Sequence, residues 1–293
     1  MSELALAEAI RRPAPRPAIV DAVADVATMI GRSLRLSLRS VDGMITTLAL
    51  TIMLMLMFVY LFGGALRTGI AYVDYVVPGV LLVCAGFGAA TTTVTVSSDL
   101  TTGVIDRFRS MDVSGAALIT GHVVASVARN LVSTALVVAA TLAIGFRPSA
   151  GVGGWLVAVG VLALFVLALS WLSATIGIIA GSPEAANGFT FFVSFLAYPS
   201  SAFVPVDTMP SWLRTFARDQ PVNTVVETTR AALTGRPVGS AAWHAVLWSL
   251  GIIAASVVAS GVLFNRRSWP ELARASHAAP DRCRRRPDAA ARC

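Results

Sequence analysis

Charged residues able to take part in polar chemistry gather in one short stretch of this sequence. Between two long apolar segments, the residues from Ser97 to Gly121 concentrate their charge at five positions: Asp99, Asp106, Arg107, Arg109 and Asp112. Acids interleaved with arginines form ion pairs at the rim of a protein interface, and the apolar Ile105, Phe108 and Met111 would fill a groove at its centre. The chemistry that we expect here is docking to a soluble partner, through which that partner moves the adjoining helices.

No residue set of the chain is typical of an active site. All 23 Lys and Arg residues are arginine. A Walker A phosphate loop needs a lysine on the β- and γ-phosphates, so any nucleotide that drives the protein must bind to another subunit. Glu184, His122 and His244 are too scattered to act together, and no H-E-x-x-H motif occurs. The three cysteines lack metal-ligand spacing. We therefore expect no catalytic residue, no metal site and no cofactor bound by this chain.

The composition places the docking stretch between membrane helices. The chain is 56% hydrophobic and 13% charged, with a mean hydropathy of +0.73, whereas soluble domains are about one-quarter charged. Apolar runs of about 18 residues or more recur, and each can cross the hydrocarbon core as a helix. The fold class that we predict is an all-α polytopic membrane protein with six transmembrane helices: Met44–Leu61, Tyr75–Ser97, Val123–Phe146, Trp155–Ala180, Ala186–Phe203 and Trp243–Phe264.

Two polar tails and an interfacial helix are expected around these spans. Residues 1–17 contain Pro and Arg and predict a disordered tail. Residues 18–40 separate apolar positions from arginines on opposite helical faces, which favours an amphipathic helix on lipid phosphates over a frayed extension of the first span. The domain organisation is therefore a tail at 1–17, a transmembrane domain at 18–267 and a basic cytoplasmic tail at 268–293.

One arginine falls inside a predicted span. Arg129 lies in the third span, one or two turns from its expected cytoplasmic end. An intramembrane charge is costly and is a functional candidate. Snorkelling to the interface and pairing with a carboxylate such as Asp106 are favoured over contact with a transported substrate.

The loop from Pro205 to Ala241 predicts a helical hairpin. The first helix would begin near Pro210 and carry an apolar face of Met209, Trp212, Leu213 and Phe216. The second would open with Thr224 and Glu227, which are three residues apart like a capping box. Two such helices between spans favour a surface or re-entrant hairpin packed on the membrane domain.

The distribution of arginine predicts the orientation. Arginines are far more frequent on the side that holds both termini and the docking stretch than on the side of the hairpin. The positive-inside rule then places both termini in the cytoplasm and the hairpin outside. A five-span alternative, in which Ala186–Phe203 does not cross, would put Arg266 and Arg267 outside and is disfavoured.

The docking stretch resembles a signature of ABC-2 type transporter permeases. In that signature the second span is followed by an acidic residue, a glycine and an acid-Arg-x-Arg run. The matching residues here are Asp99, Gly103, Asp106, Arg107, Phe108 and Arg109, continued by Ser110 and Met111. Asp112 stands where the family commonly has proline. The external segment of daunorubicin-resistance type permeases is similar to a second set of residues: Phe203 to Leu213, with Pro205, Met209, Pro210 and Trp212, then Gln220 and Pro221.

The resemblance implies an export permease that works as a pair of chains in the plasma membrane. Each chain, itself no enzyme, would bind a separate ATP-binding cassette subunit that holds ATP and Mg, with Asp99 to Asp112 as the coupling helix. The expected cargo is a hydrophobic or amphipathic compound, such as a drug, an antibiotic or a lipid. Membrane lipids are further partners; nucleic acid is not expected, since no nucleic-acid-binding fold accompanies the basic charge.

Two other function classes remain as alternatives. An ion-driven secondary transporter would need buried acids in several spans, and the predicted spans hold their acids only at their edges. A non-transporting scaffold is disfavoured by the proline in the fifth span, although abundant Gly and Ser suit plain helix packing equally well.

Overall fold

The computed structural model describes residues 27–28, 30–31, 33, 41–65, 69–102, 115–195 and 197–284. The tail at 1–17 and most of the predicted interfacial helix at 18–40 lie outside these residues. Every regular element in the described ranges is helical, and in chain order they are α3 (Val41–Leu56), the π-helix η1 (Met57–Phe62), α4 (Tyr72–Thr101), α6 (Gly115–Ile144), α7 (Val152–Ile179), α8 (Pro183–Phe195), the 3-10 helix η2 (Val206–Thr208), α9 (Ser211–Asp219), α10 (Pro221–Leu233) and α11 (Ala241–Arg284).

Within the described residues, five helices are long and apolar enough to cross a membrane: Ile45–Phe62, Tyr72–Thr101, Ala116–Ile144, Val152–Ile179 and Ala241–Leu263. The chain is thus a multi-pass membrane protein. The predicted span over Ala186–Phe203 has a different form. Its helix α8 has 13 residues and ends at Phe195, and turns follow from 197 to 204. Pro199 accounts for the break, because proline lacks the N–H that a continuing helix would use.

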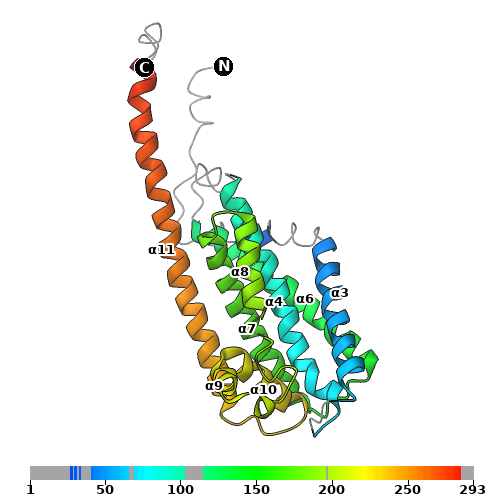
Figure 1. Ribbon diagram of the computed structural model, residues 1–293. Helices are drawn as coiled ribbons and strands as arrows, with labels where there is room; N and C mark the ends of the chain where they lie inside the picture. Colours follow the sequence, from blue (N-terminus) through cyan, green and yellow to red (C-terminus); the bar gives the residue numbers. More distant parts are fainter. Residues whose placement is uncertain are drawn as a thin grey trace, which may run out of the picture.

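Helix α4 forms the core of the bundle. In its apolar window 78% of residues are buried, against 17% in the outer spans of α3 and α11. It packs against α3, α6, α7, α8 and α10, and Figure 1 shows it inside the bundle with α3 and α11 at opposite edges. Gly177 of α7 lets the two backbones approach, since a Cβ there would lie 2.7 Å from the Thr93 carbonyl oxygen of α4. The outer helices leave apolar side chains exposed, as lipid-facing helices do.

The segment after α7 travels along α4. At Gly177 the chain lies beside Thr93 and Val96, near the last turns of α4. At Ala202 it lies beside Gly79, in the second turn of α4. The rise of an α-helix makes these two places about 20 Å apart along the axis. Helix α8 and the turns after it therefore cover most of the length that separates the two ends of the bundle.

Helices α9 and α10 lie together at one end of the bundle, and α11 passes along its side and projects beyond the opposite end (Figure 1). The capping-box prediction for the second hairpin helix is wrong. Helix α10 begins at Pro221, with Gln220 as its N-cap, because proline is preorganised for the first helical position. Thr224 lies inside the helix, where its hydroxyl donates to the Pro221 carbonyl at 2.8 Å.

Candidate functional site

The non-helical segment 197–204 is packed against the beginning of α4 and against α10, and side chains from both helices bind its backbone. A backbone without regular structure is tolerated at membrane depth only where protein supplies its hydrogen-bond partners. We call this arrangement the clamp. It consists of the segment 197–204, of the side chains that bind it, Tyr72, Gln220, Asn223 and Arg230, and of Tyr75, whose carbonyl and ring hold Arg230.

Arg230 of α10 is the centre of the clamp. Its Nε donates to the Tyr75 carbonyl at 3.0 Å, and its Nη2 donates to the Ser201 carbonyl at 2.5 Å. The guanidinium also lies over the Tyr75 ring, 3.8 Å from the centroid, where the ring quadrupole attracts it. Burial lowers the pKa of Arg230, but an arginine in a protein stays charged. One cation therefore ties α4, α10 and the broken segment together.

The other clamp side chains bind the remaining backbone groups of the segment. The Ser201 N–H donates to Asn223 Oδ1 at 2.9 Å, and the Gln220 side-chain amide donates to the Pro199 carbonyl. The Tyr72 hydroxyl donates to the Phe203 carbonyl at 3.1 Å. Each bond replaces one that a continuous helix would have made within its own backbone.

Close backbone packing completes the clamp. A Cβ built on Gly79 of α4 would lie 2.6 Å from Ala202 Cβ and 2.7 Å from the Ala202 carbonyl oxygen. Only glycine permits this approach without a backbone shift. The pair Pro78-Gly79, whose proline lies inside α4, therefore positions the broken segment directly on the core helix.

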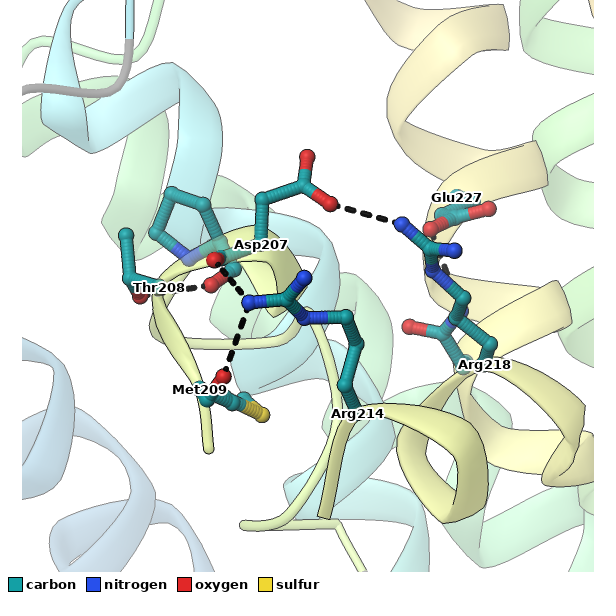
Figure 2. A network of polar contacts seen from close by, with 8 residues as sticks. Asp207, Thr208, Met209, Arg214, Arg218 and Glu227 are labelled. Carbon is teal, nitrogen blue, oxygen red and sulfur yellow. Dashed lines mark hydrogen bonds and ion pairs between the residues drawn. The ribbon is translucent and has the colours of Figure 1, made fainter. Parts of the chain in front are cut away.

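Beyond the clamp, η2 and α9 form a cap at the end of the bundle that holds α10, and Figure 2 shows its polar contacts. Arg214 donates to the carbonyl oxygens of Asp207 and Met209 at 2.8 and 3.1 Å. Arg218 Nη2 lies 2.7 Å from Asp207 Oδ1 in an exposed ion pair. Both arginines of α9 are thus engaged with η2 (Figure 2). These contacts join η2 to α9 although little of the cap is buried.

Of the six predicted hairpin residues, Trp212 lies in the first turn of α9, and the other five lie at the turns next to η2, α9 and α10. Pro205 precedes η2, Met209 follows it, Pro210 is the N-cap of α9, Gln220 is the N-cap of α10 and Pro221 opens α10. The predicted apolar face of α9 does not pack on the bundle. Trp212 is 75% exposed and Phe216 49% exposed. That face is therefore available to the membrane interface, where amphipathic aromatic rings are enriched.

Arg129 lies in the middle of α6 rather than near an end. The helix begins at Gly115 instead of Val123, which places Arg129 about 21 Å from that end. Its Nη2 donates to the Gly88 carbonyl at 3.2 Å and to Thr92 Oγ1 at 3.0 Å, both on α4. The geometry favours a structural tie between α6 and α4 over snorkelling. The alternative partner Asp106 lies outside the described residues.

The predicted docking stretch is described only at its edge. Asp99 lies in the last turn of α4, and its Oδ2 is 3.1 Å from His122 Nε2 of α6. Five other predicted residues lie outside the described ranges: Gly103, Asp106, Arg107, Phe108 and Arg109. The structure therefore shows how the two helices that flank the stretch are joined, by a contact that becomes an ion pair when His122 is protonated.

Sequence reasoning missed the clamp. Arg230 contributed only to the arginine count of the hairpin side, because it lies in the predicted hairpin and not in a predicted span. Asn223, Glu227 and Arg230 are spaced at intervals of four and three in a helix that is otherwise mostly Val, Thr and Ala. That polar stripe was the available signal, since residues three or four apart share one helical face. Asn223 Nδ2 indeed donates to Glu227 Oε1 at 3.1 Å.

Comparison with known proteins assigns this arrangement to a family. The sequence profile of the ABC-2 type transporter family matches residues 24–234, which is most of the chain. The chain belongs to the ABC-2 type transporter family. This ABC-2 chain is accordingly a transmembrane permease subunit of an ABC transporter, in a family whose permeases imply an ATP-binding cassette partner.

Relatives of this ABC-2 chain are named for drug resistance. The daunorubicin resistance ABC transporter permease protein DrrB1 of Streptomyces coeruleorubidus is 30% identical over 198 residues, which cover 67% of each chain. The probable doxorubicin resistance ABC transporter permease protein DrrC of Mycobacterium tuberculosis is 23% identical over 193 residues, which cover 66% of this chain and 70% of the relative. This likeness supports a transmembrane subunit of an ABC exporter.

Proposed function

We propose that this chain exports a hydrophobic or amphipathic compound, such as a drug, an antibiotic or a lipid, from the cytoplasm. ATP hydrolysed on a separate subunit would drive the movement, and a second permease chain, identical or related, would complete the path. The residues from Asp99 to Asp112 are the proposed docking site for the ATPase. The names of the relatives support this cargo class.

Six crossings fit this function best. Five helices among the described residues are long and apolar enough to span, and α8 with the turns to 204 would provide the sixth crossing. The advance of about 20 Å along α4 supports this assignment. Both termini and the docking site then face the cytoplasm, as the arginine distribution favours, and the cap of η2 and α9 faces outside.

The observation that carries the mechanism is the set of ties along α4. Its first turns hold the clamp through Tyr75 and Arg230, its middle is bound by Arg129, and its last turn contacts His122 through Asp99. A regular helix of 30 residues transmits movement along its axis with little deformation. A pull on the docking stretch would therefore reach the clamp through α4, about 40 Å away.

The clamp is the part of this path that is suited to change shape. Its backbone is held by a few side chains rather than by a continuous helical ladder, so a small number of bonds separates one arrangement from another. Opening of the clamp would move α10 and the cap relative to α4. In this mechanism the segment 197–204 acts as the external gate of the permease.

Reconstitution with a partner tests the docking step. The tagged chain would be co-expressed with the ATP-binding cassette subunits of its own genome and solubilised gently. Co-purifying proteins, ATP hydrolysis and cellular accumulation of daunorubicin would be measured. We expect Arg107→Glu to lose the ATPase subunit and to raise drug accumulation to the level of cells without the transporter, with unchanged expression, because the charge reversal opposes an ion-paired interface.

A matched control separates docking from general charge effects. Arg282→Glu makes the same charge reversal in the basic tail and should leave co-purification and export unchanged. Normal export by Arg107→Glu would refute the docking assignment. If the wild-type chain purifies alone and exports without ATP, an ion-driven mechanism would replace the proposal.

A further inference from the structure

The end of the first span departs from α-helical geometry. Helix α3 continues directly into the π-helix η1, where hydrogen bonds join residues five apart instead of four. The sequence of η1, MFVYLF, holds neither proline nor glycine, so an ordinary α-helix is open to it. None of its six residues is buried. The contacts that stabilise the wider turn are therefore to be found at its two ends, where it meets other elements.

Both ends of η1 contact the clamp. At its beginning, the ring of Phe58 stacks on the ring of Phe203, with centroids 4.2 Å apart and planes at 20°. At its end, Gly63 lies against Tyr72, since a Cβ built on Gly63 would be 3.5 Å from Tyr72 Cδ1. Tyr72 in turn donates to the Phe203 carbonyl. The two contacts of η1 thus converge on two clamp residues that are bonded to each other.

The spacing of these contacts fits a π-helix and not an α-helix. Phe58 and Gly63 are five residues apart, which is close to one turn of a helix whose hydrogen bonds join residues five apart. Both therefore lie on the face toward the clamp. In an α-helix each residue turns by about 100°, so the same two positions would lie about 140° apart. An α-helical η1 could keep one of the two contacts but not both.

Gly63 makes the π form possible. A Cβ built on Gly63 would overlap the carbonyl oxygen of Val59, so alanine cannot stand there while η1 keeps its wide turn. Alanine is the most favourable residue in an α-helix. Gly63→Ala therefore disfavours the π form and leaves the α form open. The next residue offers a matched comparison, because nothing lies within 4 Å of a Cβ built on Gly64.

We propose that η1 is a two-state switch coupled to the clamp, in which the π form accompanies a closed clamp and the α form an open one. When Phe203 leaves Phe58, the contacts that select the wide turn are lost and η1 closes into an α-helix. Movement of the first span reaches the segment 197–204 by this route as well as through α4. The coupling needs no transport, and its use in export rests on the proposed gate.

Thiol labelling of the clamp measures its opening in the full chain, without ATP or a partner. The three native cysteines would be replaced by alanine, and Ser201→Cys, at a residue that is 3% exposed, is the reporter. Its reaction with N-ethylmaleimide in phosphatidylcholine nanodiscs, followed by mass spectrometry, requires local opening. We expect Gly63→Ala to raise the labelling rate about tenfold and Gly64→Ala to leave it unchanged.

A double substitution tests the coupling itself. Phe58→Leu removes the ring that stacks on Phe203 and should by itself raise the labelling rate. With this contact gone, Gly63→Ala should add about twofold or less, because the two changes remove the same coupling. Equal labelling of the Gly63→Ala and Gly64→Ala chains would overturn the proposal. So would independent effects of Phe58→Leu and Gly63→Ala that multiply in the double variant.

Deletion of Leu61 separates the switch from a general loss of folding. Leu61 is 69% exposed, and its removal leaves Phe58 and Gly63 four residues apart, where an α-helix places them on one face. In that background Gly63→Ala should no longer raise the labelling rate or lower the unfolding temperature. Continued rapid labelling would refute the switch. Unchanged export of daunorubicin by a Gly63→Ala chain with raised labelling would refute the gate and support the switch.

Discussion

Helix α4 and the segment 197–204 lie side by side and satisfy their backbones in opposite ways. Helix α4 runs through 30 residues with its hydrogen bonds inside the helix. The segment 197–204 relies on side chains of α4 and α10, among them Tyr72, Asn223 and Arg230. Both regions meet the requirement that no backbone group stays unpaired in an apolar setting. Helix α4 meets it with regular helical hydrogen bonds, and the segment 197–204 meets it with individual side chains.

This difference predicts where single substitutions have large effects. In α4 no one side chain carries the helix's own backbone, so a side-chain change there leaves the helical hydrogen bonds in place. In the clamp a single side chain donates hydrogen bonds to several carbonyl groups at once. Its loss leaves these carbonyl groups without that donor. A membrane protein can therefore keep a rigid helix and a switchable segment in contact, provided that the switch depends on few bonds.

The largest expected effect comes from Arg230→Ala. The change leaves the Tyr75 and Ser201 carbonyl oxygens without this donor, and removes the cation over the Tyr75 ring. We expect the free energy of unfolding to fall by about 3 kcal/mol. Thermal unfolding of the chain in lipid nanodiscs, followed by tryptophan fluorescence, would measure it.

Arg218→Ala is the matched control for this experiment. Arg218 lies on the neighbouring helix α9, and its ion pair with Asp207 is exposed, with side-chain exposures of 59% and 80%. Exposed pairs contribute about 0.5 kcal/mol or less. Equal destabilisation by the two variants would show that the clamp depends on cap charge rather than on buried carbonyl groups.

A smaller effect is expected from Gly79→Val. The new Cβ would lie 2.6 Å from Ala202 Cβ and 2.8 Å from its Cα, so the backbone of the broken segment must shift. Overpacking of this kind destabilises by about 2 kcal/mol. Gly160→Val in α7 places the same side chain where nothing lies within 4 Å. Unfolding temperatures that fall equally in both variants would contradict the close approach.

The sequence predicted the regular helices well because their signal is local. The expected spans at Tyr75–Ser97 and Trp155–Ala180 differ from α4 and α7 by at most four residues at any end. The start of α6 was missed by eight residues. The predicted docking stretch extends to Gly121 and so includes residues 115–121, although Ala117, Leu118 and Ile119 are apolar and buried. The charged residues of the docking stretch hid the apolar pattern of the first two turns of α6 from the sequence analysis.

The clamp could not be predicted in the same way, because its partners are distant in sequence. Arg230 and Tyr75 are 155 positions apart, and no local pattern encodes that contact. Arg129 was identified because an arginine in an apolar run is conspicuous, whereas Arg230 lies in the predicted second helix of the hairpin, outside every predicted span. Pro199 indicated a break in the fifth span, but not the side chains that compensate for it.

The smallest effect is expected from Tyr72→Phe, which removes only a hydroxyl. That hydroxyl donates to the Phe203 carbonyl at 3.1 Å, in a side chain that is 7% exposed. We expect a loss of about 1 kcal/mol in the free energy of unfolding, measured as for Arg230→Ala. Tyr60→Phe is the control, since Tyr60 is 74% exposed and should be neutral. No effect from Tyr72→Phe would mean that water reaches the Phe203 carbonyl, and this end of the clamp would then be wetted rather than sealed against α4.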